Sequence, residues 1–450
     1  MKVKRSNYNM LLKNDKGDTC LFNTRTCAKL KFSPIAAKRL NALLDNDIVE
    51  LNENDVMEKE LYDKQIFLPL DYDEVRWIEL KFNQMVYDTS FLSVTIMPTI
   101  NCNFRCAYCY ETPKETSMDK ETLTRVKKFF DKKIPFCKQV KVSWFGGEPL
   151  LCKDVVLDLM EHIDCLCKNY GAAVVGTMNT NGYLLDVDTF KKLVALRVRT
   201  YEICIDGPKE LHNIQRPHFE KSDSYQVILS NLLQIKDKVR SHAFKIGIRT
   251  NITPQIEPLL EKHLDEISKY FSGDNRFYVS FQGVRDWGGS RIADSMVLGT
   301  EKEKIVNRDW HKVANTKGLP SIELIPIIPF AGYCDAPRNN GYVINYDGTL
   351  HKCTIAMFSK EHCKDDNIGF IDQYGNPIVD EEKLGRWIVR PNAVRETCKK
   401  CKIFPMCVDG SCAYQKNLQG NNRCNPINEM IQSQILRFDE MGLIPYCSVE

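Results

Sequence analysis

Long hydrophobic runs are absent from this 450-residue chain, and neither sign of charge is in excess. No run reaches the roughly eighteen apolar residues of a membrane-spanning helix, and the start MKVKRSNYNMLLKNDKGD lacks the apolar core of a signal peptide. Lysine and arginine number 62 against 59 aspartates and glutamates, a net charge of +3. This balance gives no basis for binding nucleic acid or an acidic membrane, so we expect a soluble, cytoplasmic protein with neither partner.

Cysteine, in contrast, is abundant. The chain has 19 cysteines, which in a reducing compartment serve as metal ligands more often than as disulfides. Because exposed iron–sulfur sites and thiolates react with oxygen, we expect an anaerobic setting. With 43% hydrophobic residues, a chain of this length can bury sizeable cores and is predicted to hold more than one domain.

Three cysteines stand close together in the segment NCNFRCAYCYE, residues 101–111. Cys102, Cys106 and Cys109 form a C-x3-C-x2-C set. A 4Fe-4S cubane takes one ligand for each iron, so three thiolates leave the fourth iron open to a small molecule. A zinc site is the alternative, but zinc sites usually add a second cysteine pair nearby, and residues 110–129 contain none.

This motif resembles that of the radical S-adenosylmethionine (SAM) enzymes, which commonly carry an aromatic residue where Tyr108 stands. The resemblance implies a cluster held by the three cysteines. Strand-like and helix-like patterns alternate from about residue 91 to residue 289. This alternation favours parallel strands joined by right-handed crossovers. The six strand-like runs are 92–97, 139–145, 172–178, 200–205, 244–250 and 277–281. The resemblance implies that they form a partial (βα)6 barrel, of the α/β class.

Short motifs follow the predicted strands, at the end where parallel barrels carry their reactive groups. In Gly146-Gly147-Glu148-Pro149 the glycines let a ligand approach the backbone, and Glu148 offers a carboxylate to a cation. In the resembled family this segment binds the amino group of SAM. The residues that we expect to bind the cofactor are Tyr108, Gly146, Gly147, Glu148, Asn181, Cys204, Asp206 and Arg249.

Some of these assignments leave alternatives open. Relatives often have serine where Cys204 stands, so Cys204 is either a substitute contact or a small buried residue, and we favour the second. Arg249 could reach the SAM carboxylate. His212 and Arg216 lie in a family-like segment, where we expect them to position a helix and a loop. The catalytic residues stay unassigned.

A second set of cysteines resembles the SPASM extension of radical SAM enzymes, which carries two auxiliary clusters. The resemblance assigns an outer cluster to Cys398, Cys401, Cys407 and Cys424, and an inner cluster to Cys334, Cys353 and Cys412. The inner set lacks a fourth cysteine. Its open iron could bind a substrate thiolate, an oxygen or nitrogen ligand, or Cys363. Zinc is the alternative for the whole set.

The N-terminal residues read as a separate module, with a hairpin around the turn at residues 14–18 and a helix capped by Ser33. The arrangement resembles modules that bind a leader peptide as an added strand. A mere support for the barrel is the alternative. The predicted domains are 1–90 (leader-recognition-like module), 91–290 (radical SAM partial barrel), 291–333 (bridging segment) and 334–450 (SPASM auxiliary-cluster domain).

These features together predict a peptide maturase with three 4Fe-4S clusters and SAM. It would form a 5′-deoxyadenosyl radical and install a crosslink in a ribosomally made precursor peptide, either a thioether, which we favour, or a carbon–carbon bond. A reductase, flavodoxin or ferredoxin would supply electrons. The rivals are an anaerobic sulfatase-maturating enzyme, whose family has an aspartate base where Thr354 stands, and a non-catalytic iron–sulfur electron carrier.

Overall fold

A computed structural model describes most of the chain. The described residues are 1–287, 292–299, 309–321, 329, 334–359, 366–389, 396–407, 412, 414 and 427–448. They form two compact units, each built from segments that are distant in sequence. The first unit contains residues 1–86, 323–334 and 390–450, and the second contains residues 87–322 and 335–389. The four predicted domain ranges stay a prediction, and much of the bridging segment lies outside the described residues.

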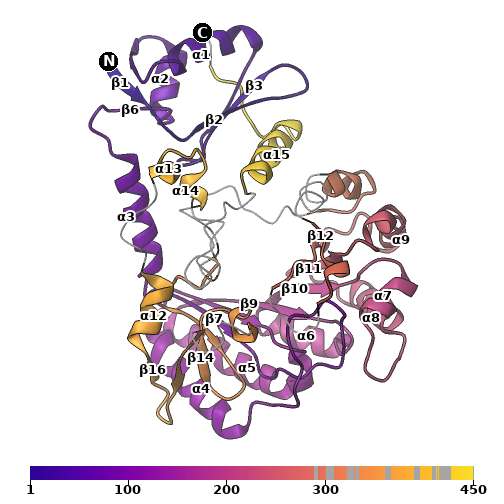
Figure 1. Ribbon diagram of the computed structural model, residues 1–450. Helices are drawn as coiled ribbons and strands as arrows, with labels where there is room; N and C mark the ends of the chain where they lie inside the picture. Colours follow the sequence, from indigo (N-terminus) through magenta and orange to yellow (C-terminus); the bar gives the residue numbers. More distant parts are fainter. Residues whose placement is uncertain are drawn as a thin grey trace. The chain divides into compact units, whose positions relative to one another are not determined.

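The second unit is organised around six parallel strands that run in sequence order across one sheet (Figure 1). They are β7 (Phe91–Ile96), β8 (Gln139–Trp144), β9 (Ala173–Thr180), β10 (Val198–Cys204), β11 (Lys245–Ile252) and β12 (Phe277–Gly283). Each pairs in parallel with the next. The predicted α/β class with a central parallel sheet is therefore confirmed.

Helices connect the strands and pack on one another (Figure 1). They are α4 (Lys120–Lys133), α5 (Lys153–Tyr170), α6 (Val187–Ala195), α7 (Lys209–Gln215), α8 (Ser224–Lys238) and α9 (Leu260–Phe271). Aspartate side chains at Asp119, Asp186 and Asp223 accept the free N–H groups that begin α4, α6 and α8. These caps, together with buried apolar residues at helical spacing, explain why the sequence pattern located these helices.

Residues 341–379 extend the same sheet beyond β7. Strand β13 (Gly341–Ile344) pairs in parallel with β7, and β14 (Thr349–His351), β15 (Asn367–Ile371) and β16 (Pro377–Val379) follow in antiparallel order. Helix α12 (Glu381–Ile388) comes after them. The first strand of the barrel is therefore an interior strand of a ten-stranded sheet.

The first unit contains two three-stranded sheets. One joins β5 (Ile48–Glu50), β1 (Lys2–Arg5) and β6 (Phe67–Leu68); the other joins β2 (Asn9–Lys13), β3 (Thr19–Asn23) and β4 (Lys29–Phe32). The helices of its N-terminal part are α1 (Pro34–Leu44), α2 (Val56–Asp63) and α3 (Glu74–Val86). The hairpin and the helix capped by Ser33 occur as expected, and Ser33 accepts from the Ala36 N–H. The sequence analysis did not predict the strands β1, β4 and β5.

C-terminal residues complete the first unit. Helices α13 (Glu396–Lys399), α14 (Phe404–Cys407) and α15 (Ile427–Glu440) belong to it, and Ile431 and Ile435 of α15 share a core with Met10 and Phe22. Beyond α15, the chain runs beside β4: Lys31 donates its N–H to the Pro445 carbonyl and accepts from the Cys447 N–H. The outer edge of β4 is therefore already covered.

A buried ion pair fixes the base of α3 in the first unit. Arg25 and Glu74 have side chains only 1% and 5% exposed, and Arg25 Nε lies 3.0 Å from Glu74 Oε1. Ser6 Oγ donates to the same oxygen at 2.6 Å, and the Asn7 N–H donates to Oε2 at 2.9 Å. The Arg25 guanidinium also lies over the rings of Tyr72 and Trp77. A charge so enclosed needs its partner.

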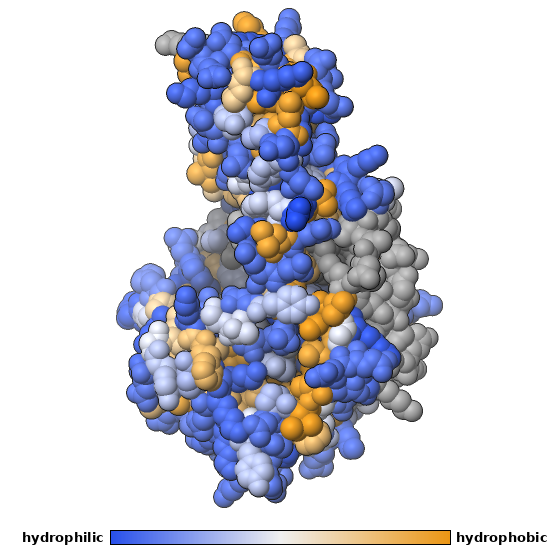
Figure 2. Space-filling model, turned by 90° about the vertical axis from the view of Figure 1, so that its left-hand side faces the viewer, coloured by the Kyte–Doolittle hydropathy of each residue, from blue (hydrophilic) through white to orange (hydrophobic). Residues whose placement is uncertain are grey.

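Among the described residues, no helix is long and apolar enough to cross a membrane. On the face shown in Figure 2 the coloured surface is mostly hydrophilic, with hydrophobic residues in separate patches.

The substitution Arg25→Met should destabilise the first unit by about 3–5 kcal/mol, because it leaves the Glu74 carboxylate buried without a cation. Hydrogen exchange in peptides from residues 1–86 should become faster. The matched control is Lys127→Met, which removes one partner of an exposed pair with Asp158 and should cost less than about 1 kcal/mol. Equal effects of the two substitutions would contradict this account.

Candidate active site

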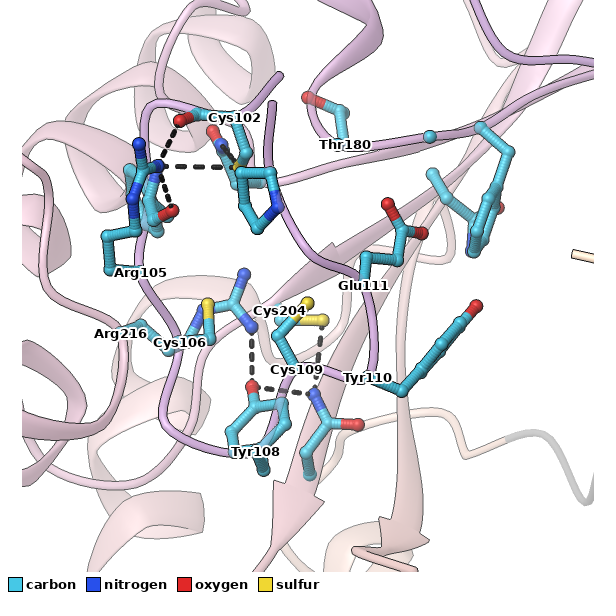
Figure 3. A pocket seen from close by; sticks show the side chains of 18 of the residues that line it. Cys102, Arg105, Cys106, Tyr108, Cys109, Tyr110, Glu111, Thr180, Cys204 and Arg216 are labelled. Carbon is cyan, nitrogen blue, oxygen red and sulfur yellow. Dashed lines mark hydrogen bonds between the residues drawn. The ribbon is translucent and has the colours of Figure 1, made fainter. Parts of the chain in front are cut away.

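A cavity of about 190 Å³ lies beside the cluster loop, residues 101–111, and the ends of β8 to β11 (Figure 3). Backbone and side chains from five successive strands and loops line it. The lining residues are Cys102, Phe104, Arg105, Cys106, Tyr108, Cys109, Tyr110, Glu111, Pro113, Phe145, Gly146, Gly147, Asn179, Thr180, Asn181, Glu202, Cys204, Arg216, Arg249 and Asn251. Side chains from distant parts of the sequence thus meet where the parallel-barrel rule expects reactive groups.

The cluster loop is held by the last residue of α7 and by the segment that follows it. The N–H groups of Arg105 and Ala107 donate to the carbonyls of Pro217 and Gln215, each at 2.9 Å. Phe104 is 1% exposed, and its ring meets the edges of the Tyr183 and His218 rings. An otherwise irregular loop therefore has fixed backbone partners and a buried aromatic anchor.

The Gly146-Gly147 turn packs directly against the start of the cluster loop. A Cβ atom on Gly146 would lie 2.4 Å from the Thr99 carbonyl oxygen, and one on Gly147 would lie 2.1 Å from the Asn101 carbonyl oxygen. Gly146 also has φ +106°, a conformation that favours glycine. The Glu148 N–H donates to the same Asn101 carbonyl at 2.8 Å. Both glycines therefore serve a backbone-to-backbone contact between the two motifs.

Glu148, expected to bind the SAM amino group, is fully buried and does not line the cavity. Its Oε1 accepts from Thr180 Oγ1 at 2.8 Å and from the Leu150 N–H at 3.0 Å, while Oε2 accepts from the Asn181 N–H at 2.8 Å. Burial raises the pKa of Glu148, against the effect of these hydrogen bonds. The carboxylate joins the GGEP turn to the end of β9.

Tyr108 belongs to a buried charge cluster at one side of the cavity (Figure 3). Its hydroxyl donates to Asp206 and accepts from Arg216 Nη1 at 2.5 Å and from Asn251 Nδ2 at 3.1 Å. Arg216 Nη1 also lies 3.3 Å from Asp206, and the Asn251 N–H donates to Asp206 at 2.7 Å. Behind them His212 accepts from the Asp206 N–H at 3.1 Å, and burial lowers the pKa of His212 well below its usual value.

A second ion pair lies along the ends of β10 and β11. Arg249 Nη1 lies 2.7 Å from Glu202 Oε1, which also accepts from Asn179 Nδ2 at 3.1 Å. Arg249 Nε donates to Asn251 at 2.9 Å, so the two charge clusters are connected. Cys204 lines the cavity, and the Asn251 amide lies 3.3 Å from its sulfur.

Residues 96–251 match the family model of the radical SAM superfamily. They form a radical SAM domain. A cysteine-type anaerobic sulfatase-maturating enzyme of Clostridium perfringens (strain 13 / Type A) is 22% identical over 374 residues, which cover 76% of this chain and 95% of that enzyme. The corresponding enzyme of Clostridium novyi (strain NT) is 27% identical over 350 residues, or 71% of this chain and 87% of that enzyme. The chain is homologous to these enzymes.

Solved structures share the fold of this chain. Native anSMEcpe with bound AdoMet and Cp18Cys peptide has a TM-score of 0.55 and 20% identity, covering 78% of this chain and 98% of that one. Streptococcus suis SuiB bound to precursor peptide SuiA has a TM-score of 0.50 and 13% identity, covering 92% of this chain and 96% of that one. The radical SAM superfamily implies a 4Fe-4S cluster and SAM.

The three motif cysteines of the radical SAM domain fit such a cluster. Cys102, Cys106 and Cys109 all line the cavity, and burial raises the pKa of Cys102 to about 12, so its thiolate requires a bound cation. In the described part of the chain, no three Cys, His, Asp or Glu side chains surround a point as one metal ion would require. A cubane makes a different demand, because each thiolate binds its own iron.

Glu111 is a lining residue that the sequence analysis missed. Its side chain is 5% exposed, its Oε2 is buried without a hydrogen-bond partner, and burial raises its pKa to about 8. Glu202 and Asn251 were also missed. Arg216, which we expected only to position a helix and a loop, lines the cavity as well. The position of Glu111, two residues after the last cluster cysteine, was the available signal.

The cysteines assigned to auxiliary clusters lie in both units. Cys398, Cys401 and Cys407 lie on or beside α13 and α14, where the Cys401 N–H donates to the Cys398 carbonyl at 2.9 Å. Cys334 and Cys412 also belong to the first unit, whereas Cys353 belongs to the second. Cys424 and the alternative ligand Cys363 lie outside the described residues. The two ligand sets stay a prediction.

The substitution Gly147→Ala should lower the iron content by about four atoms per chain, because the added methyl group pushes the cluster loop away from the GGEP turn. Iron analysis after anaerobic reconstitution measures this loss. The control is Gly385→Ala in α12, where an added Cβ meets nothing within 4 Å and iron should be unchanged. Full iron retention in the Gly147 variant would contradict the steric argument.

Proposed function

We propose that this protein is a radical SAM enzyme that matures a ribosomally made precursor peptide, in which it installs a thioether crosslink. The carrying observation is the cavity in which the three cysteines meet the glycine turn, a buried ion pair and a second, half-buried ion pair. Relatives that are sulfatase-maturating enzymes, and solved structures with bound peptides, support a peptide or protein as the substrate. The cysteine-rich composition supports a cytoplasmic, reducing location.

The side chains that line the cavity divide the work of binding and orientation. Cys102, Cys106 and Cys109 would hold the cluster, and Gly146 and Gly147 let the GGEP turn pack directly against the start of the loop that carries these cysteines. When bound, the reduced cluster and SAM supply a 5′-deoxyadenosyl radical that abstracts a hydrogen atom from the substrate. The charged side chains around the cavity are held in ion pairs with one another, so their orientation is fixed before a ligand enters.

Residue 354 favours a crosslink over formylglycine formation. The Thr354 hydroxyl is hydrogen-bonded to the phenol of Tyr110. Tyr110 lines the cavity, and its ring contacts the ring of Phe358. In the sulfatase-maturating family an aspartate base occupies this position. A threonine hydroxyl is a far weaker proton acceptor than a carboxylate, so it supplies no comparable base.

The decisive assay is anaerobic. Protein, SAM, dithionite and a cysteine-containing precursor peptide should yield 5′-deoxyadenosine, methionine and a peptide that has lost two hydrogen atoms. The homologues favour a second candidate, the sulfatase-maturating activity, so a cysteine-type sulfatase peptide belongs in the same assay. Formylglycine in that peptide, without a crosslink in the other, would replace the proposal. Clusters without SAM cleavage would indicate an electron carrier.

The edge of β2 supports a site for the leader part of such a peptide. Every second residue of this segment is hydrogen-bonded to the β3 side through its backbone, namely Tyr8, Met10 and Leu12. The backbone groups of Leu11 and Lys13 therefore face away from β3. In the described residues, neither N–H group has a partner. A cavity of about 230 Å³ beside this edge is lined by Met10, Leu11, Leu12, Cys401, Lys402, Ile403 and Gln432. An added peptide strand could use both the backbone groups and the cavity.

The substitution Leu11→Pro should weaken binding of that peptide at least about tenfold, because it removes an outward N–H from an edge where proline fits the strand. Fluorescence anisotropy of the labelled peptide measures the change. Cys447→Pro is the paired test, since it removes a hydrogen bond that holds the C-terminal segment on β4. Tighter binding to the Cys447 variant and no effect at Leu11 would assign the peptide to β4 instead.

Three clusters are part of the proposal. Cys334, Cys353 and Cys412 would hold an inner auxiliary cluster, which would offer one open iron to a substrate thiolate. A reductase, flavodoxin or ferredoxin would supply the electrons in the cell.

Anaerobically reconstituted protein should contain about twelve irons per chain, and the variant with alanine at Cys102, Cys106 and Cys109 should contain about eight. Iron and sulfide analysis of both proteins measures the difference. If the wild-type protein holds about four irons, the variant holds none, and both retain zinc, the C-terminal cysteines form a structural site and the open-cluster mechanism fails.

A further inference from the structure

Two buried hydroxyl groups of the N-terminal hairpin contact a cysteine-bearing turn near the other end of the chain. Tyr8 and Thr24 stand at the open end of the hairpin formed by β2 and β3, and both residues are fully buried. The Tyr8 hydroxyl donates to the Lys399 carbonyl at 3.0 Å, and the Thr24 hydroxyl donates to the Lys402 carbonyl. Both contacts lie within the first unit.

The two accepting carbonyls lie on either side of Cys401. Lys399 ends α13, and Lys402 lies before α14, where helix ends leave carbonyl groups in need of donors. Inside this turn, the Cys401 N–H donates to the Cys398 carbonyl, and the Phe404 N–H donates to the Cys401 carbonyl, each at 2.9 Å. The two hydroxyl groups therefore fix the backbone both before and after Cys401.

The hairpin holds its two donors beside one another. The Thr24 N–H donates to the Tyr8 carbonyl at 3.0 Å, and the Tyr8 N–H donates to Ser6 Oγ at 3.2 Å. Ser6 is itself bound to the buried Glu74 carboxylate. The rings of Tyr8 and Phe404 lie with their centroids 6.4 Å apart. Burial raises the pKa of Tyr8, so its phenol keeps the proton that it donates.

The turn suits a metal site. Among the described cysteines of the predicted outer cluster, Cys401 is exposed, and Cys398 and Cys407 are half-buried. None of the three is enclosed in a core, where a thiol is inert. A thiolate on an exposed turn has many orientations unless the backbone that carries it is fixed, and here two buried donors fix that backbone.

We propose that Tyr8 and Thr24 are positioning residues for the metal site that contains Cys398 and Cys401. The inference rests on the auxiliary clusters of the proposed function, not on the identity of the peptide. Residues that orient a metal ligand typically change metal affinity by about 10- to 100-fold when they are removed. The N-terminal hairpin is thus part of the metal site, although these two residues supply no ligand.

The test measures how fast a ferrous chelator removes iron from the anaerobically reconstituted chain. Tyr8→Phe and Thr24→Val each remove one donor with little change of shape, and each should release the outer cluster, about four irons, about tenfold faster. Thr24→Ser keeps the hydroxyl group and should release iron at the wild-type rate. Cys398→Ala identifies the outer cluster, because it should lack that phase of release.

Two controls separate positioning from general loss of structure. Tyr446→Phe removes another phenol of the first unit, one that donates to Asp18 at 2.7 Å, and should leave iron release unchanged. The electron paramagnetic resonance spectrum of each reduced variant should keep the signal of the radical SAM cluster and its response to added SAM, since that cluster lies in the second unit.

Wild-type release rates in both Tyr8→Phe and Thr24→Val would overturn the inference. Equal release from Thr24→Val and Thr24→Ser, or loss of the radical SAM signal together with the outer cluster, would overturn it as well. If the cysteines hold zinc, faster zinc release from the same variants supports the positioning role and refutes the auxiliary cluster. Absence of any metal at these cysteines refutes both. The expected release rates without peptide modification would refute the proposed function alone.

Discussion

The candidate site depends on one close contact between two backbones. The carbonyl oxygens of Thr99 and Asn101 lie only 2.4 and 2.1 Å from the positions that Cβ atoms on Gly146 and Gly147 would take. Without side chains at these two positions, the cluster loop and the GGEP turn approach closely enough for the Glu148 N–H to reach the Asn101 carbonyl. The cavity lies beside this contact, so part of its wall is main chain that side-chain rotation cannot alter.

Burial then dictates how charge is arranged around that contact. Asp206 and Arg216 are almost completely enclosed, and each would be costly alone. Tyr108 and Asn251 bridge them and connect them to the ends of β10 and β11. Since Tyr108 also stands between two cluster cysteines, the charge cluster orients the loop as well as the cavity wall. A change at any of these side chains is therefore felt at the cysteines.

Sequence patterns predicted the repeating part of this fold because its signals are local. Each of the six parallel strands is a short apolar run, and aspartate caps mark three of the helices between them. The cysteine and glycine motifs are likewise recognised from the spacing of their residues along the chain. The role of each acidic residue is different, since it depends on partners far along the chain. Glu148 meets Thr180 and Asn181, which no pattern around residue 148 could reveal.

Distant pairing also explains what the sequence could not predict about the ends of the chain. Residues 445–447 cover the outer edge of β4 through two backbone hydrogen bonds, and backbone groups carry no residue signature. With β4 covered, β2 is the edge of that sheet that no other described strand covers, and the cavity beside β2 is lined in part by Cys401 and Ile403. A peptide strand added there would lie next to the C-x2-C pair of Cys398 and Cys401. The β2 edge and this cysteine pair belong to the same compact unit.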